Sequence, residues 1–360
     1  MSVAEVNLLN IVLMGLSAAV AWSHPVETFL FVYGFLGPLH YLTEISWLHD
    51  KKWFAHGRRF WIAPSIAAVA AAALYAWSNH VAPAERAAAL AEGRAMRPLT
   101  PTAPFFGTTL NVTELLLVGI VAATVAAAFV RNGARRLWIA AAGLGVGLLL
   151  WPMQPWRLFL IYFLSTFVHV FLFTNCFMLY GSQKSRSLTG YAAWAVHLGL
   201  GALLLFNGDD GFGALPERAT YEKLGSFDGL AMVTARSLGF PTDPGPKLLA
   251  SLVAVLRFMA FAYTYHYLNW FSKTGIIRWH EMPRRRLGVI LATWIASAAL
   301  YAWDWQKGFI ALLALSLAHV YLEFPLNWRT FVGIAQEFRA RATSRAAPRT
   351  GGVVATPAVD

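Results

Sequence analysis

Long apolar runs separated by short polar segments form the dominant pattern along this chain. A helix needs roughly 20 apolar residues to cross the hydrocarbon core of a bilayer, and these runs are continuous instead of alternating, which favours helices over barrel strands. The pattern therefore predicts an all-α polytopic membrane bundle of about ten transmembrane helices. The predicted spans are residues 6–23, 27–48, 59–78, 111–130, 137–152, 157–180, 190–206, 247–271, 287–303 and 308–327.

The segments outside the spans suggest one membrane domain followed by a short tail. Residues 1–338 form the predicted transmembrane domain, and the long polar segments 79–110 and 207–246 are expected to cap it. Residues 1–23 lack the basic region that begins a secretory signal, so we expect an uncleaved first span. Residues 339–360, rich in Arg, Ala, Thr and Pro, are predicted to form a disordered basic cytoplasmic tail.

Composition agrees with a membrane protein and excludes several other classes. The 360 residues are 58% hydrophobic and 13% charged, whereas soluble domains are about 25% charged. The single cysteine, Cys176, excludes an internal disulfide and a cysteine-based zinc site. The net charge of +11 comes from basic residues beside the spans, which is typical of topology signals and contacts with anionic lipid. We therefore expect the lipid bilayer, and no nucleic acid, as a partner.

The distribution of basic residues predicts an orientation. If the segment 49–59 is placed in the cytoplasm and each span switches sides, 19 of the 29 Lys and Arg residues lie in cytoplasmic segments. The opposite orientation would violate the positive-inside rule at every major loop. The sequence thus predicts an integral protein of a bacterial inner (cytoplasmic) membrane, with both termini in the cytoplasm.

Ionisable residues inside the predicted spans carry the strongest functional signal. Such residues are costly in lipid, so they face the bundle interior and mark function. The segments HYLTE (40–44) and HVYLE (319–323) both read His-x-x-x-Glu, which places each pair on one helix face, one turn apart. A helix-bending proline, Pro38 or Pro325, lies near each pair.

Histidines on four spans lie at similar predicted depths, about five to eleven residues from the cytoplasmic end. The orientation was derived from Lys and Arg alone, so this agreement is independent of it. Imidazoles and carboxylates together bind Fe, Mn or Zn, and open His/carboxylate sites are typical of non-haem iron oxygen chemistry. The predicted metal ligands are His40, Glu44, His169, His266, His319 and Glu323, and the surrounding groups expected to support them are His197, Asn269, His49 and Tyr265.

Other interpretations fit parts of this pattern. Bis-histidine haem would use four histidines on four helices but has no use for the two glutamates, and a haem or quinone site would indicate an electron carrier. A proton- or ion-coupled transporter would use the same groups as a relay without a stoichiometric metal. A lone intramembrane histidine is most often hydrogen-bonded to a neighbour, and it is the shared depth and the two pairs that favour a metal.

One short segment also has a family resemblance. Gly37-Pro38-Leu39-His40 opens a span and is followed by an acid, Glu44. It resembles the start of the bacterial carotene 15,15'-dioxygenases related to the bacteriorhodopsin-related protein, multi-span membrane proteins whose intramembrane histidines are believed to hold iron. The resemblance implies His40 as the first iron ligand and His169, His266 and His319 as candidates for the others. The family's His-x-x-x-His pair is absent; His319-x-x-x-Glu323 stands nearest to it, so no substrate is implied.

Together these features predict a membrane-bound, metal-dependent oxygenase or oxidoreductase. Non-haem iron is the expected cofactor, with haem as the alternative. The expected substrates are dioxygen and a hydrophobic small molecule such as a carotenoid, an isoprenoid or a lipid.

Overall fold

The computed structural model is almost entirely helical in the residues that it describes. A hairpin of two short strands, β1 (Thr102–Phe105) and β2 (Thr108–Asn111), occupies part of the segment expected to cap the bundle. Because the other described elements are all helices, the all-α class predicted from the sequence is confirmed. The described residues are 2–51, 62–92, 102–111, 133–153, 167–207, 238–242, 246–273 and 281–346, with isolated positions at 115–126, 231–236, 275 and 278.

The helices follow the predicted apolar runs closely in most of the described ranges. Five of them, α1, α9, α12, α14 and α15, are long and apolar enough to cross a membrane, which supports an integral membrane protein. The helices are α1 (Val3–Ser23), α2 (Pro25–Phe31), the π-helix η1 (Val32–Leu36), α3 (Gly37–Asp50), α4 (Ile62–Ala91), α6 (Gly133–Leu149), α8 (Thr174–Ser185), α9 (Leu188–Phe206), α12 (Pro246–Ser272), α14 (Arg284–Trp303) and α15 (Trp305–Ala346).

Two helices extend beyond the ranges expected from hydropathy. Helix α4 continues past residue 78 to Ala91, and α15 continues to Ala346, into the tail that was predicted to be disordered from residue 339. The α15 extension is rich in alanine and arginine, which favour helix. It is also anchored, because Arg341 donates hydrogen bonds to the Tyr191 hydroxyl at 2.8 Å and to the Gln183 carbonyl at 2.9 Å.

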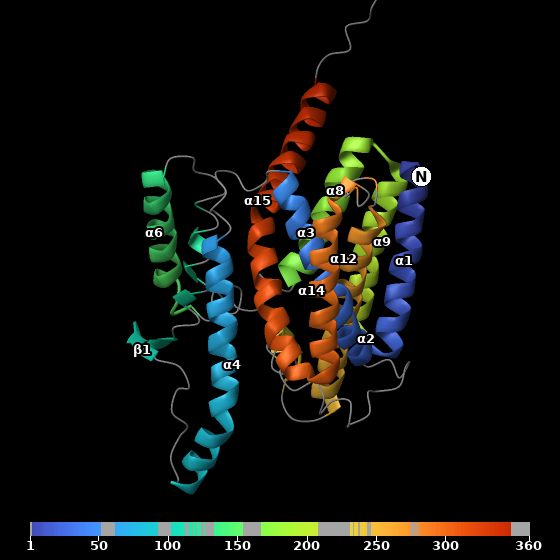
Figure 1. The fold of residues 1–360 in the computed structure, drawn as a ribbon. Helices are drawn as coiled ribbons and strands as arrows, with labels where there is room; N and C mark the ends of the chain where they lie inside the picture. The colour runs from blue at the N-terminus through green and yellow to red at the C-terminus, as the bar shows by residue number, and fades with distance from the viewer. Residues whose placement is uncertain are drawn as a thin grey trace, which may run out of the picture.

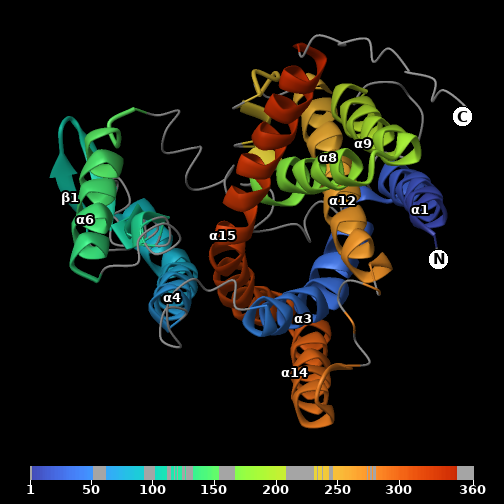
Figure 2. The same ribbon diagram turned by 90° about the horizontal axis from the view of Figure 1, so that it is seen from above.

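Helix α12 is the central element of the bundle (Figure 1). It packs against α1, α2, α9 and α3, while α15 packs against α3, α8 and α14. Of the most apolar window of α12, 83% is buried, compared with 22% for α1 and 17% for α14. The last two helices are therefore peripheral. Helix α4 lies along the outer side of α15, with α6 and the hairpin farther out (Figures 1 and 2).

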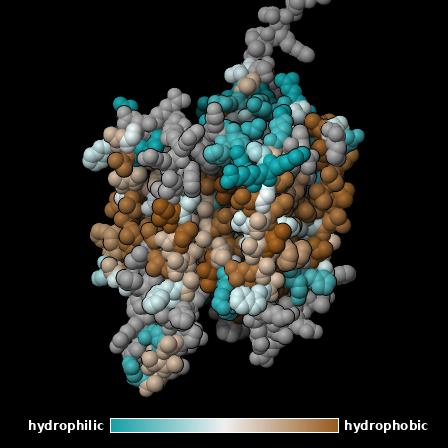
Figure 3. Space-filling model, viewed as in Figure 1, coloured by the Kyte–Doolittle hydropathy of each residue, from teal (hydrophilic) through white to brown (hydrophobic). Residues whose placement is uncertain are grey.

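The outer surface is apolar where a membrane would lie. Large hydrophobic side chains such as Leu8 and Leu16 on α1, and Val289 and Ile295 on α14, are more than half exposed. Figure 3 shows a brown belt across the middle of the molecule, with hydrophilic residues gathered at the end where α1 begins and α15 ends. Such an extensive apolar patch on a soluble protein would cause aggregation, so the belt fits a lipid environment.

Candidate metal centre

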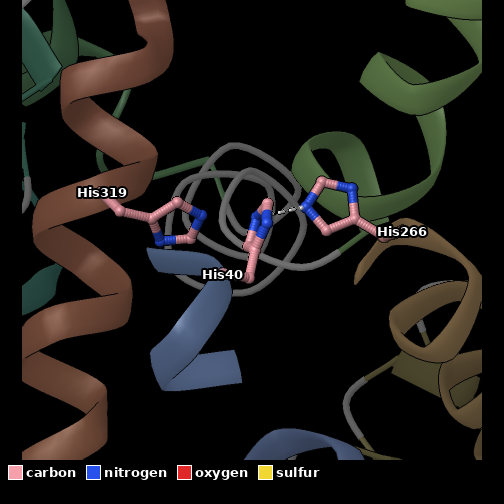
Figure 4. Close-up of side chains that lie close together, drawn as sticks. All are labelled: His40, His266 and His319. Atoms are coloured by element: carbon pink, nitrogen blue, oxygen red, sulfur yellow. Dashed lines mark hydrogen bonds between the residues drawn. The ribbon is translucent and has the colours of Figure 1, made fainter. Parts of the chain in front are cut away.

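Four buried histidines meet in the middle of the helical bundle. His40 lies on α3, His266 on α12 and His319 on α15, and His169 lies in the π-helical segment 167–173 that leads into α8. Seen from above, α3, α12, α8 and α15 surround one central region (Figure 2). In Figure 4, the His40 ring lies between those of His266 and His319. One ring nitrogen from each of these three residues lies within 4.8 Å of the other two, so this trio could hold a metal ion.

The spacing of the imidazole nitrogens agrees with a shared ion. The Nε2 atoms of His40 and His266 are 3.0 Å apart, as are the Nε2 atoms of His169 and His319. Two ligands at right angles around a metal, with bonds of about 2.1 Å, lie about 3.0 Å apart, and opposite ligands lie about 4.2 Å apart. The ring nitrogens of the trio lie up to 4.8 Å apart, so only a small inward shift of the rings would bring the widest pair to the spacing of opposite ligands.

Hydrogen bonds to the outer ring nitrogens determine where two of the protons lie. The Thr174 hydroxyl donates to the Val170 carbonyl at 2.7 Å, so its oxygen accepts the Nδ1 proton of His266 at 2.8 Å. The Nδ1 group of His319 donates to the Ser316 carbonyl at 2.7 Å. Both imidazoles therefore carry their proton on Nδ1 and direct the lone pair of Nε2 toward the centre, as a metal ligand must.

The two predicted glutamates lie against the histidines. Glu44 Oε2 is 3.0 Å from His40 Nε2, and Glu323 Oε2 is 3.1 Å from His169 Nδ1. The two carboxyl groups are also within hydrogen-bonding reach of each other, and both side chains are almost completely buried. The structure thus brings all six residues of the predicted ligand set into one cluster. Whether they bind metal stays a prediction.

The polar groups of this cluster are only partly satisfied by each other. His40 Nε2 lies 3.0 Å from both Glu44 Oε2 and His266 Nε2, but a single N–H group can make a good hydrogen bond to only one of them. Within the described part of the chain, Glu44 Oε2 and Glu323 Oε2 accept no hydrogen bond, and no Lys or Arg pairs with either carboxylate. Buried carboxylates without a countercharge are costly, and a bound cation would remove that cost.

Irregular helix geometry positions two of the histidines. The π-helix η1 ends at Leu36, immediately before α3 and His40, and His169 lies inside the second π-helical segment. A π-helical turn adds a residue to the helix and rotates the residues after it, and such turns are frequent at functional sites. Pro38 lies in the first turn of α3, directly after η1, and provides no N–H group to the helix there.

Aromatic side chains enclose the cluster. The Tyr41 ring stacks on the His319 ring with 4.2 Å between centroids, and its hydroxyl hydrogen-bonds to that of Tyr267 at 2.6 Å. Trp270 packs edge-on against His40 and donates to the Thr43 hydroxyl at 3.0 Å. These contacts hold the rings in fixed orientations and keep water out, which strengthens electrostatic interactions at the centre.

The four groups expected to support the ligands lie in different surroundings. His197 is fully buried between Phe171, Phe261 and Tyr265, and neither ring nitrogen has a hydrogen-bond partner among the described residues. Tyr265 donates to Asn10 at 3.0 Å. His49 and Asn269 line two separate cavities. In the described structure the ligands are instead supported by Thr174 and by the Ser316 carbonyl, a backbone group that no side-chain pattern reveals.

Replacing Thr174 by valine tests the orientation of His266. Valine has nearly the same shape but cannot accept the Nδ1 proton, so we expect metal affinity to fall about 10–100-fold while the protein stays folded. Competition with a chelator of known affinity measures the change. Thr264→Val is the matched control, because Thr264 also donates to a backbone carbonyl of its own helix, that of Ala260. Equal metal affinity in the two variants would contradict the assigned tautomer.

Comparisons with known proteins do not assign this chain to a family. No family model matches the chain, and no curated protein or solved structure matches it either. The fold and the site define a class only: a helical protein with candidate membrane spans and a buried histidine cluster that could bind metal.

Proposed function

We propose that this protein is an integral-membrane oxygenase that uses non-haem iron to oxidise a hydrophobic small molecule. The observation that carries the proposal is the buried cluster of imidazoles and carboxylates, with nitrogen lone pairs directed inward and no Lys or Arg among the described residues to neutralise the glutamates. Iron held by the histidines, with the glutamates as further ligands or as acceptors that orient the imidazoles, would supply the chemistry that activates dioxygen. The proposed ligands are His40, Glu44, His169, His266, His319 and Glu323.

The same geometry argues against haem as the cofactor. Bis-histidine ligation places two Nε2 atoms on opposite sides of the iron, roughly 4 Å apart for bonds of about 2 Å, with the flat macrocycle between the rings. The Nε2 atoms of His40 and His266 are 3.0 Å apart, and so are those of His169 and His319. Neither pair leaves a slot for a porphyrin.

The chain's own residues have separable roles in this proposal. Thr174 and the Ser316 carbonyl keep the imidazoles in the metal-binding tautomer, and Glu44 and Glu323 supply the negative charge that balances a divalent cation. The aromatic side chains of Tyr41, Tyr267 and Trp270 exclude water from the reacting centre. Exclusion of water protects reactive oxygen chemistry from side reactions.

An apolar cavity against two of the helices that carry the cluster supports a hydrophobic substrate. Its volume is about 700 Å³, within the range of small-molecule sites, and α3, α4, α14 and α15 line it. Helices α3 and α15 also carry two histidines and both glutamates of the cluster. Its walls include Leu42, Ile45, Ile290, Leu312, Leu315 and Leu322, and the polar residues Ser46, His49 and Arg286 lie at one end. This lining suits a long apolar molecule such as a carotenoid, an isoprenoid or a lipid.

Filling this cavity should impair substrate use without disturbing the metal. Ala314 on α15 lines the cavity, and Ala314→Phe would occupy part of it. We expect the KM for the apolar substrate to rise by about tenfold or more, with unchanged iron content, because a bulky ring displaces the substrate from apolar wall contacts. Ala296→Phe, on the exposed face of α14, is the matched control. Loss of iron in Ala314→Phe, or unaltered kinetics, would argue against this cavity as the substrate site.

The finer topology is part of the proposal. About ten spans, a cytoplasmic location of both termini and a bacterial inner membrane follow from the charge distribution. The hydrophilic end of the molecule in Figure 3 would then face the cytoplasm.

Oxygen labelling tests the proposed activity. The iron-loaded protein in lipid nanodiscs is incubated under ¹⁸O₂ with a carotenoid, an isoprenoid alcohol or an unsaturated fatty acid, and the products are analysed by mass spectrometry. We expect oxygen uptake that depends on one of these substrates, with label in its product. Iron-replete protein that consumes no oxygen with any of them, but moves ions or solutes across proteoliposomes, would replace the oxygenase with a transporter.

A further inference from the structure

A second cavity lies at the hydrophilic end of the bundle, away from the metal ligands. Its volume is about 450 Å³, and α1, α8, α9 and α12 enclose it. None of the described residues that line it is acidic, and one of them, Lys273, is basic. The cavity contains no member of the proposed ligand set. Its chemistry therefore has to be explained separately from that of the metal centre.

Two hydrogen-bond donors of this cavity have no partner among the residues that the structure describes. Asn269 is only 7% exposed and lines the cavity, and its side-chain amide makes no hydrogen bond to any described residue. Lys273 directly follows α12, and no carboxylate among the described residues lies within ion-pair distance. Burial lowers the pKa of Lys273 to about 8, as expected for an ammonium group without a countercharge. A buried amide and a partly buried ammonium on one wall favour an anion.

The other polar groups of the cavity are already bonded within the protein. The Ser182 hydroxyl donates to the Met178 carbonyl at 2.7 Å, and the Ser185 hydroxyl donates to the Gly181 carbonyl at 2.8 Å. The Asn10 amide donates to the Val6 carbonyl at 2.8 Å. The two serine oxygens thus remain available only as acceptors. They suit a ligand that carries a hydroxyl group beside its negative charge.

One wall of the cavity is apolar. It is formed by Val3 and Val6 of α1 and by Phe177 and Met178 of α8. Val3 is 56% exposed, so this wall continues onto the outer apolar surface of α1. A ligand with an anionic head and an apolar body would match both walls, and a small anion would match the polar wall alone.

We propose that this cavity binds a phosphate ester through the Lys273 ammonium and the Asn269 amide. The phosphate group belongs either to the head of an anionic phospholipid or to a small soluble molecule such as glycerol phosphate, and the chemistry of recognition is the same. The site is independent of the proposed oxygenase function, since it shares no residue with the metal centre.

Binding measurements on the purified full-length protein in neutral detergent test this site. One arm titrates glycerol phosphate, and the other titrates short-chain phosphatidylglycerol against phosphatidylcholine, with native mass spectrometry counting the bound molecules. We expect one tightly bound anion per chain and no preference for phosphatidylcholine. Lys273→Met should weaken binding by at least about tenfold and Asn269→Leu by a smaller factor, since a hydrogen bond to a charged group is the stronger one. Lys273→Arg should retain most of the affinity.

Lys184→Met is the matched control, because Lys184 lies on α8 near the same end, is exposed, and packs over the Tyr180 ring outside the cavity. Binding in the glycerol phosphate arm would identify a soluble ligand, and binding only of phosphatidylglycerol would identify a lipid. If Lys273→Met does not fold, the anion affinities of Asn269→Leu and Lys184→Met are compared instead, and weaker binding by Asn269→Leu alone supports the site. Absence of binding in both arms, or equal affinity in the wild type and the cavity variants, would overturn the site whatever the metal content.

Discussion

Replacement of His266 by alanine is expected to release the metal and abolish activity. Its Nε2 atom is 3.0 Å from that of His40 and belongs to the trio whose ring nitrogens could share one ion. Loss of a direct ligand should reduce metal affinity by more than about 100-fold, since even supporting groups are worth 10–100-fold. His40→Ala and His319→Ala should behave alike.

The bundle should remain folded in these variants, because membrane helices are held by packing and by backbone hydrogen bonds within each helix. Metal content and circular dichroism of each purified variant measure the two effects. His24→Ala is the control, because His24 is exposed and its ring contacts Ser23, the last residue of α1. If the three variants instead lose a little stability independently and keep the wild-type metal content, these histidines only make hydrogen bonds to their neighbours and do not bind metal.

Replacement of Glu323 by glutamine should have opposite effects on the metal-bound and metal-free protein. Glutamine keeps the shape of the side chain but removes one of two acidic carboxyl groups that lie close together at the centre. We expect metal affinity to fall by at least about tenfold, and further if Glu323 is a direct ligand. The metal-free protein should be equally stable or more stable by up to about 1–4 kcal/mol, because a costly buried charge is removed.

Thermal unfolding with and without a chelator measures this difference, and Glu44→Gln should reproduce it. Glu27→Gln is the control, because Glu27 lies in the first turn of α2, outside the cluster. If Glu323→Gln lowers the stability of the metal-free protein as much as that of the metal-loaded protein, the glutamate has a structural hydrogen-bonding role and no role in charge balance.

The sequence pattern predicted the helical class and the grouping of the six cluster residues better than it predicted the surroundings of the cluster. The position of a residue along its span gives its depth in the membrane, and the His-x-x-x-Glu spacing places both side chains on one helix face. The cluster of six residues could therefore be predicted from the sequence. Depth does not give rotation about the helix axis. His197 has a similar depth but faces an aromatic pocket, and Asn269 faces the cavity at the end of α12.

Other features were beyond the reach of hydropathy. The π-helical turns next to His40 and around His169 arise from packing in the bundle and leave no periodic signal. The extension of α15 to Ala346 depends on local helix propensity and on the contacts of Arg341, which a membrane-span criterion does not measure. The ten predicted spans include ranges outside the described residues, so their number stays a prediction.

Elemental analysis of the wild-type protein tests the central claim most directly. The protein is purified from iron-supplemented cells without chelators, and its metals are measured together with its visible spectrum. The account predicts stoichiometric non-haem iron, no Soret band, and loss of the iron in His266→Ala. Wild-type protein that contains only trace Fe, Mn, Zn and Cu, and takes up none of them on addition, would contradict the metal centre.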